Sequence, residues 1–349
     1  MQQNLFNTHN KKTLKAEAHQ KSEKRYTLSF YRYLNVENPQ AFRDDLYMSW
    51  ENLGVLGRIY VASEGINAQL SIPETNYDLL EKDLNNRFPN LHIKKAIEES
   101  SVSFSVLKIK VRKKILADGL NDDSFDVTNT GKHLSAKEFN EAMNSDETIV
   151  VDLRNHYESE VGHFKGAVCP DVDTFREELP VVLDMLEGKE DKKILLYCTG
   201  GIRCEKASAY FKHKGFDDVN QLKGGIIHYK EQVDSEGLEN KYIGKNFVFD
   251  DRMGERISDD VIAKCHQCGE SCDTHINCAN DACHVLFIQC DKCKEKYHSS
   301  CSDECSAISQ LPEEEQRKMR REGHTPAKTF KSRLRPRLGE YLKARGLDS

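Results

Sequence analysis

The stretch Tyr197-Cys198-Thr199-Gly200-Gly201-Ile202-Arg203-Cys204 decides the fold of the central part of this chain. It continues the apolar run 194–197, which is typical of a buried strand, and leads into a segment with helical apolar spacing at 205–214. Cys198 therefore lies in a glycine-rich turn between a strand and a helix. The N–H groups of such a turn, the positive end of the helix dipole and the nearby Arg203 all favour a thiolate over a thiol. The sequence therefore predicts a nucleophilic cysteine at position 198.

The segments around this turn alternate between strand and helix patterns. Apolar strand runs are expected at 148–153, 193–197 and 219–222, and helices at 135–143, 173–186 and 205–214. Such alternation predicts a parallel sheet with helices on both faces, in an α/β domain spanning 134–240.

The length of the turn carries information about its ligand. Four residues separate Cys198 from Arg203, one fewer than in the phosphate-binding loop of cysteine phosphatases, so the pocket suits a sulfur carried on the cysteine better than a tetrahedral phosphate. Gly200 and Gly201 let the backbone N–H groups turn inward, and Arg203 can hold an anion or steady the loop. The alternative is an inert buried thiol. Cys204 is predicted either to resolve an oxidised or persulfidated Cys198 or to pack in the first helical turn.

Residues 25–115 are predicted to form a ferredoxin-like α+β domain. Strands are expected at 26–33, 57–62, 67–72 and 103–111, and helices at 39–53 and 75–88, in the order strand, helix, strand, strand, helix, strand. Lys108, Lys110 and Arg112 share one face of the last strand. Together with Tyr31, Arg32 and Tyr33 on a neighbouring strand, they are consistent either with an RNA-binding surface or with a solvated sheet edge guarded by lysines.

Nine of the twelve cysteines lie between Cys265 and Cys305, in a segment too polar to build its own core. The two pairs Cys265-x-x-Cys268 and Cys290-x-x-Cys293 predict one tetrahedral structural zinc site. A second site is expected from Cys278, Cys283, Cys301 and Cys305. An iron–sulfur cluster and unligated reduced cysteines are the alternatives. This cysteine-rich metal-binding region covers 265–305.

Composition bounds the remaining segments. The 349-residue chain carries a net charge of −6, which gives no general reason to expect nucleic acid and none to expect DNA. No run approaches the length of a membrane span, and the polar N-terminal extension 1–24 has no signal-peptide core, so a cytoplasmic location is expected. Segments 116–133 and 241–264 are interpreted as a linker and a connector. The basic tail 306–349 suits an RNA backbone, or is simply solvated.

The motifs Val151-Asp152-Leu153-Arg154, Glu158, Gly162-His163-Phe164-Lys165-Gly166-Ala167 and Leu222-Lys223-Gly224-Gly225-Ile226, together with the Cys198 loop, resemble the rhodanese domain. In that family the cysteine matching Cys198 carries a persulfide. The resemblance implies that Asp152 and His163 support the fold around the loop rather than act as acid and base.

A wider resemblance covers nearly the whole chain. The segments Ser63-Glu64-Gly65-Ile66-Asn67-Ala68, Gly244-Lys245-Asn246-Phe247-Val248-Phe249-Asp250 and Arg252-Met253-Gly254-Glu255-Arg256 are similar to those of the bacterial rhodanese-containing tRNA uridine hydroxylases. This resemblance implies oxygen-dependent conversion of the wobble uridine to 5-hydroxyuridine, with molecular oxygen as co-substrate and the tRNA anticodon loop as partner.

Oxygen chemistry at a uracil carbon ordinarily uses a flavin or a redox metal. No flavin or nicotinamide fingerprint and no triad of two histidines and a carboxylate is visible in the sequence, so the oxygen-activating cofactor stays open. Two hypotheses remain for the cysteine: Cys198 attacks C6 of the pyrimidine, or a thiol-derived species delivers oxygen. The alternative functions are a sulfurtransferase that passes persulfide sulfur from Cys198 to an acceptor, and a non-catalytic RNA-binding protein that uses the rhodanese fold as a scaffold.

Overall fold

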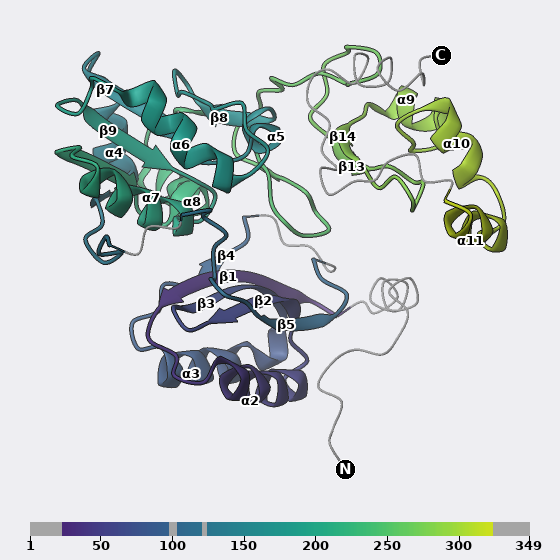
Figure 1. The fold of residues 1–349 in the computed structure, drawn as a ribbon, viewed down its shortest axis with the longest axis horizontal. Coiled ribbons are helices and arrows are strands. Elements are labelled where there is room, and N and C mark those ends of the chain that lie inside the picture. The colour runs from purple at the N-terminus through teal and green to yellow at the C-terminus, as the bar shows by residue number, and fades with distance from the viewer. Residues whose placement is uncertain (1–22, 98–102, 121–123, 324–349) are drawn as a thin grey trace.

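The N-terminal domain is a five-stranded sheet with two helices on one face (Figure 1). The computed structural model of this protein describes residues 23–97, 103–120 and 124–323. The domain consists of β1 (Arg25–Tyr33), α2 (Pro39–Asn52), β2 (Leu56–Ala62), β3 (Gly65–Pro73), the 3-10 turn η1 (Glu74–Asn76), α3 (Tyr77–Arg87), β4 (Lys94–Lys95) and β5 (Leu107–Val111). The predicted helices and the first three strands are confirmed to within about three residues.

The strand order β4-β1-β3-β2-β5 contains the ferredoxin-like arrangement in its first four members. β3 lies antiparallel between β1 and β2, and β4 pairs antiparallel with the other side of β1. The strand predicted at 103–111 is present over 107–111, but it is not the fourth strand of this arrangement, which is the two-residue β4. That segment contributes β5, a fifth strand parallel to β2 at the opposite edge.

This order also corrects the predicted joint surface of Lys108, Lys110 and Arg112 with the tyrosines of β1. Two strands, β3 and β2, separate β5 from β1, so these groups do not lie on adjacent strands. The periodicity of a strand indicates which residues share a face but not which strands lie next to it, so the prediction that β5 lies next to β1 is wrong.

The two faces of β1 and β3 have different chemistry. Leu28 and Phe30 on β1 pack with Ala68 and Leu70 on β3 into a core around Trp50 of α2. The alternate residues of the same strands are polar and point away from the helices. They are Thr27, Ser29, Tyr31, Tyr33, Asn67, Gln69 and Ser71. In Figure 1 the central domain lies on this second side of the sheet.

The central domain has a parallel sheet in the order β6-β10-β9-β7, as the alternation of patterns predicted. Its elements are β6 (Lys132–Leu134), α4 (Ala136–Ala142), β7 (Thr148–Asp152), α5 (His156–Ser159), β8 (Gly162–Phe164), α6 (Phe175–Leu186), β9 (Lys193–Tyr197), α7 (Ile202–His213), β10 (Asp218–Leu222) and α8 (Gly225–Glu236). Residues of α6 and α7 pack on one face of the sheet, and residues of α4 and α8 on the other. Cys198 directly follows β9, one of the two inner strands.

The remaining elements extend from the central domain. β11 (Tyr242–Asn246) pairs with β8 and with β12 (Glu255–Arg256). The cysteine-rich region contains β13 (His275–Asn277), β14 (Leu286–Ile288), α9 (Asp291–Lys296) and α10 (Asp303–Ser309), and is followed by α11 (Glu313–Arg321). Most of the predicted N-terminal extension and of the basic tail lies outside the described residues. Among the described helices, none is long and apolar enough to cross a membrane.

Candidate active site

The loop after β9 is held by the beginnings of two helices. The N–H of Gly201 donates to the Cys198 sulfur at 3.1 Å, and α7 begins at the next residue. The N–H groups of Ile226 and Ile227 in α8 donate to the carbonyl oxygens of Cys198 and Thr199 at 3.0 and 3.3 Å. The sequence therefore places one end of α8 against the loop, so that the backbone around Cys198 is fixed from both sides.

The surroundings of Cys198 favour the thiolate. Complete burial would by itself raise the pKa of this thiol. The hydrogen bond from the Cys204 thiol, the charge of Arg203 and the backbone N–H groups of both residues outweigh burial and lower the pKa to about 5. These contacts lower the pKa of Cys198, and its role as a nucleophile stays a prediction.

Arg203 steadies the loop through an ion pair. Its guanidinium donates to both carboxylate oxygens of Glu158 at 2.8 and 3.0 Å, and Glu158 is completely buried. Such a bidentate pair fixes the plane of the guanidinium. The sequence allowed Arg203 either to hold an anion or to steady the loop, and these contacts correspond to steadying the loop.

Cys204 packs in the first turn of α7 and is completely buried. Burial, followed by the hydrogen bond to Cys198 and the charge on that sulfur, raises the pKa of Cys204 well above its ordinary value. In the ground state Cys204 is therefore a neutral donor to Cys198, and its role as a resolving thiol stays a prediction.

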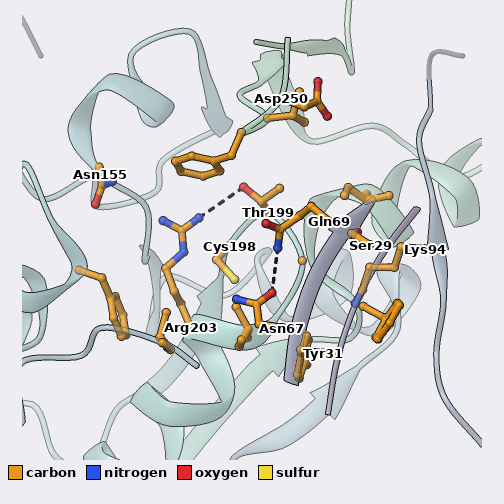
Figure 2. A pocket seen from close by; sticks show the side chains of 18 of the residues that line it. Ser29, Tyr31, Asn67, Gln69, Lys94, Asn155, Cys198, Thr199, Arg203 and Asp250 are labelled. Atoms are coloured by element: carbon orange, nitrogen blue, oxygen red, sulfur yellow. Dashed lines mark hydrogen bonds between the residues drawn. The ribbon is translucent and has the colours of Figure 1, made fainter. Parts of the chain in front are cut away.

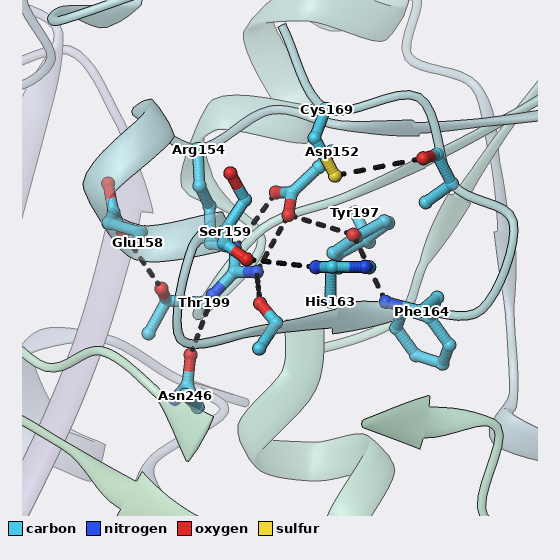
Figure 3. A network of polar contacts seen from close by, with 12 residues as sticks. Asp152, Arg154, Glu158, Ser159, His163, Phe164, Cys169, Tyr197, Thr199 and Asn246 are labelled. Carbon is cyan, nitrogen blue, oxygen red and sulfur yellow. Dashed lines mark hydrogen bonds and ion pairs between the residues drawn. The ribbon is translucent and has the colours of Figure 1, made fainter. Parts of the chain in front are cut away.

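A second polar network lies beneath the loop (Figure 3). Asp152 accepts hydrogen bonds from the Arg154 guanidinium at 2.7 and 2.8 Å and from the Tyr197 hydroxyl at 2.8 Å. His163 lies 2.9 Å through Nδ1 from the carbonyl oxygen of Ser159. Neither Asp152 nor His163 lines the cavity at Cys198. These contacts support the framework roles that the resemblance implied for both residues.

Cys198 lines a cavity of about 610 Å³ between the two domains (Figure 2). The loop residues Thr199, Gly200, Ile202 and Arg203 contribute one wall. The polar face of the N-terminal sheet contributes the opposite wall, through Thr27, Ser29, Tyr31, Asn67, Gln69 and Lys94. A volume of this size is typical of sites for small ligands. Cys198 is completely buried and belongs to the residues that line this space, which can hold a reactant.

The sequence did not lead us to predict the wall formed by the N-terminal sheet. Its signal was the alternation of polar residues along β1 and β3, which is also the pattern of an ordinary solvated sheet face. Polar contacts hold this wall in place: the Tyr31 hydroxyl donates to Glu205 at 3.0 Å, and Lys206 pairs with Glu64 at 3.2 Å and Asp118 at 3.0 Å. Lys206 is 3% exposed, and its pair with Asp118 is buried on both sides, whereas Glu64 is partly exposed.

Sequence models of three families match successive parts of the chain. Residues 25–115 match the UPF0176 acylphosphatase like domain, residues 135–232 the Rhodanese-like domain, and residues 243–306 the family described as Rhodanase C-terminal. The first two ranges correspond to the two domains on either side of the cavity, and the third range contributes Val248, Phe249, Asp250, Arg252 and Glu255 to its lining.

Several curated relatives align with almost the full chain. A protein of Leptospira interrogans serovar Lai, named tRNA uridine(34) hydroxylase, is 56% identical over 339 residues, which cover 96% of this chain and 92% of the relative. This chain belongs to the tRNA uridine(34) hydroxylase family. Proteins with the same name from Photorhabdus laumondii and Yersinia pestis are 48% and 52% identical and cover 99% and 90% of this chain, and the same shares of their own lengths. The resemblance drawn from the sequence is confirmed.

In this member of the hydroxylase family the cysteine-rich region brings eight thiols into two groups of four. The groups are Cys265, Cys268, Cys290 and Cys293, and Cys278, Cys283, Cys301 and Cys305, with the sulfurs of each group within 4.8 Å of one another. Both groupings are those predicted from the sequence. The sulfurs of Cys268 and Cys290 are 3.6 Å apart, and those of Cys283 and Cys301 are 3.7 Å apart. A tetrahedral ion with bonds of about 2.3 Å would hold its sulfurs about 3.8 Å apart, so both groups fit one metal ion each.

Proposed function

We propose that this protein hydroxylates uridine 34 of tRNA at C5, with molecular oxygen as co-substrate and Cys198 as the reactive group. Relatives that align over almost the whole chain are named for this modification. The observation that carries the assignment to a residue is the Cys198 sulfur, ionised by its loop and facing a cavity large enough for a nucleotide. The partner is the anticodon loop, which contains position 34, and the expected location is the cytoplasm.

Hydroxylation requires that both atoms of dioxygen are accounted for. One oxygen atom enters the C5–H bond, and the other leaves as water after taking up two electrons and two protons. We propose a thiol reductant as the source of these electrons. Cys198 then acts either by adding to C6, which makes C5 electron-rich, or by carrying the sulfur species that transfers oxygen.

The test uses a strain from which the gene is deleted. Wild-type protein should restore a nucleoside 16 Da heavier than uridine in tRNA hydrolysates, and Cys198→Ala should not. Cys169→Ala is the matched control, because Cys169 is a second thiol of the central domain and does not line the cavity. Formation of the heavier nucleoside by the Cys198→Ala protein would exclude both roles of Cys198. Binding of tRNA without any modification by the wild type would instead support the scaffold function.

The same thiolate favours sulfur transfer as the second candidate function. A terminal persulfide sulfur on Cys198 would extend into the cavity, where an acceptor could approach it. Turnover of thiosulfate with cyanide at a rate comparable to that of dedicated rhodaneses, with uridine 34 unchanged in the deletion strain, would establish this alternative.

We further propose that the two thiol groups each bind one structural zinc ion. The short distances between sulfurs support a single ion in each group, because the thiolates of a four-iron cluster bind different iron atoms and lie farther apart. The metals would stabilise a region with little apolar core of its own.

A further inference from the structure

Three polar residues from three strands form a row across the roof of the cavity. Ser29 on β1 lies directly opposite Lys94 on β4 and opposite Gln69 on β3. Directly paired residues point to the same face of a sheet, and neighbouring strands lie about 4.8 Å apart, so the row spans about 10 Å between its outer Cα atoms. All three residues line the cavity opposite Cys198 (Figure 2). We call Lys94, Ser29 and Gln69 the roof row.

The orientation of the Gln69 amide is fixed by a chain of hydrogen bonds. The Asn67 amide nitrogen donates to the backbone carbonyl of Ile115 at 3.3 Å, and Gln69 Nε2 donates to Asn67 Oδ1 at 2.8 Å. A backbone carbonyl can only accept, so Asn67 must present its oxygen to Gln69, and Gln69 must donate to it. Gln69 Oε1 is thereby left as an acceptor, without a hydrogen-bond partner among the residues that the structure describes.

The other end of the row is a cation. Lys94 is 3% exposed, and within the described part of the chain no carboxylate pairs with its ammonium group. The group lies 4.8 Å from the centre of the Tyr31 ring. Burial lowers the pKa of Lys94 to about 8, whereas the charges of Cys198 and Glu205 act to raise it. At its two ends the row therefore offers a buried cationic donor, Lys94, and an acceptor on the partly buried Gln69, with the Ser29 hydroxyl between them.

A base must leave the anticodon stack to reach Cys198, because this residue is completely buried at the wall of the cavity. Uracil presents its N3–H donor next to its O4 acceptor. C5 is bonded to C4, so a ring whose C5 edge faces the loop places O4 on the side of the loop. Lys94 is the member of the roof row whose side chain lies beside the Cys198 loop, since a Cβ atom added to Gly200 would lie 3.9 Å from Lys94 Cδ.

We propose that the roof row recognises the edge of an everted uracil, with Gln69 Oε1 accepting from N3–H and the Lys94 ammonium donating to O4. This assignment rests on the proposed hydroxylation of uridine 34 and gives its specificity a structural basis. Cytosine would direct the N3 lone pair at an acceptor and its amino group at an ammonium, so both contacts would be lost. The N-terminal domain is therefore the part of the site that selects the base.

The test compares binding of two anticodon stem-loop RNAs, identical except for U or C at position 34, by fluorescence anisotropy. Wild-type protein should prefer the U34 RNA roughly tenfold, since leaving buried polar groups unpaired is costly. Gln69→Leu should bring the ratio of dissociation constants close to one. Gln40→Leu is the matched control, because Gln40 lies exposed on α2 and should leave the ratio unchanged. A wild-type ratio near one, or an unchanged ratio in Gln69→Leu, would overturn the assignment.

Two variants of Lys94 distinguish the loss of a specific contact from misfolding. Lys94→Met should lower the preference for U34, and Lys94→Arg, which keeps a cationic donor, should restore most of it. Loss of preference in both variants alike would argue against a specific donor. Hydroxylation of the U34 RNA is measured separately: modification without base discrimination would refute the role of the roof row, and discrimination without modification would refute the proposed function.

Discussion

The protonation of Cys198 gives the sharpest prediction from the geometry of the loop. Its pKa of about 5 lies far below the ordinary value of 9.0 for a cysteine. At pH 7 such a thiol is about 99% ionised, compared with about 1% for an unperturbed one. Because the pKa is lowered, the thiolate is present above pH 5 and is lost as the pH falls through that value. Alkylation by iodoacetamide should therefore show a midpoint near pH 5.

The midpoint, and not the rate at one pH, is the diagnostic quantity. A thiolate of low pKa is also a weaker nucleophile, so its rate at pH 7 does not rise in proportion to its ionised fraction. Peptide mass spectrometry resolves the two thiols of the loop, because trypsin cleaves after Arg203 and separates Cys198 from Cys204. Cys204 should stay unmodified across the pH range of the Cys198 titration, since the pKa of Cys204 is raised.

The paired variant Glu158→Gln/Arg203→Met tests the cause of this low pKa. It removes both charges of the buried pair together and avoids leaving Glu158 as an unpaired buried anion. The loss of a nearby cation should raise the midpoint for Cys198 by roughly 1–3 pH units. A wild-type midpoint near pH 9, or an unchanged midpoint in the paired variant, would refute the electrostatic reasoning.

Three further outcomes are expected. Gly225→Ala should disrupt the loop and abolish activity, because a Cβ atom there would lie 2.5 Å from the Cys198 carbonyl oxygen. The control Gly188→Ala has a similar positive φ and nothing within 4 Å, so it should cost only about 1–2 kcal/mol of backbone strain. Equal loss of activity in both variants would contradict this reasoning. Glu158→Gln alone should lower the free energy of unfolding in urea by about 3–5 kcal/mol, and a change below about 1 kcal/mol would show that the ion pair with Arg203 is dispensable. Elemental analysis should find two zinc ions per chain and one after either Cys265→Ala or Cys278→Ala, and two ions retained in either variant would exclude the proposed ligand groups.

The strand, loop and helix around Cys198 can be predicted from the sequence because their signals are local. The apolar run of β9, two adjacent glycines and the following helical spacing lie within about twenty residues. The paired cysteine spacing of the first metal group is local in the same sense. The cysteines of the second group alternate along the chain with those of the first, and the predicted set of four is the set that the structure brings together.

Features that depend on distant parts of the chain could not be predicted in this way. β4 consists of Lys94 and Lys95 alone, and two residues carry no periodicity. Its place beside β1 is decided by the path of the chain after α3. The polar row along β3 has the same sequence pattern as a solvated sheet face, and only the position of the central domain against it creates a cavity. The residues proposed to select the base were for this reason absent from the predicted site.

Lys206 lies buried between Glu64 and Asp118, and this arrangement bears on how a large RNA enters a small chamber. Swinging the two halves of the protein apart would separate Lys206 from Glu64 and expose both groups to water, so this pair adds only a small term that favours the closed arrangement. A single-stranded loop can turn out one nucleotide at low cost, so we expect the tRNA to insert that nucleotide into the chamber while the two halves stay together.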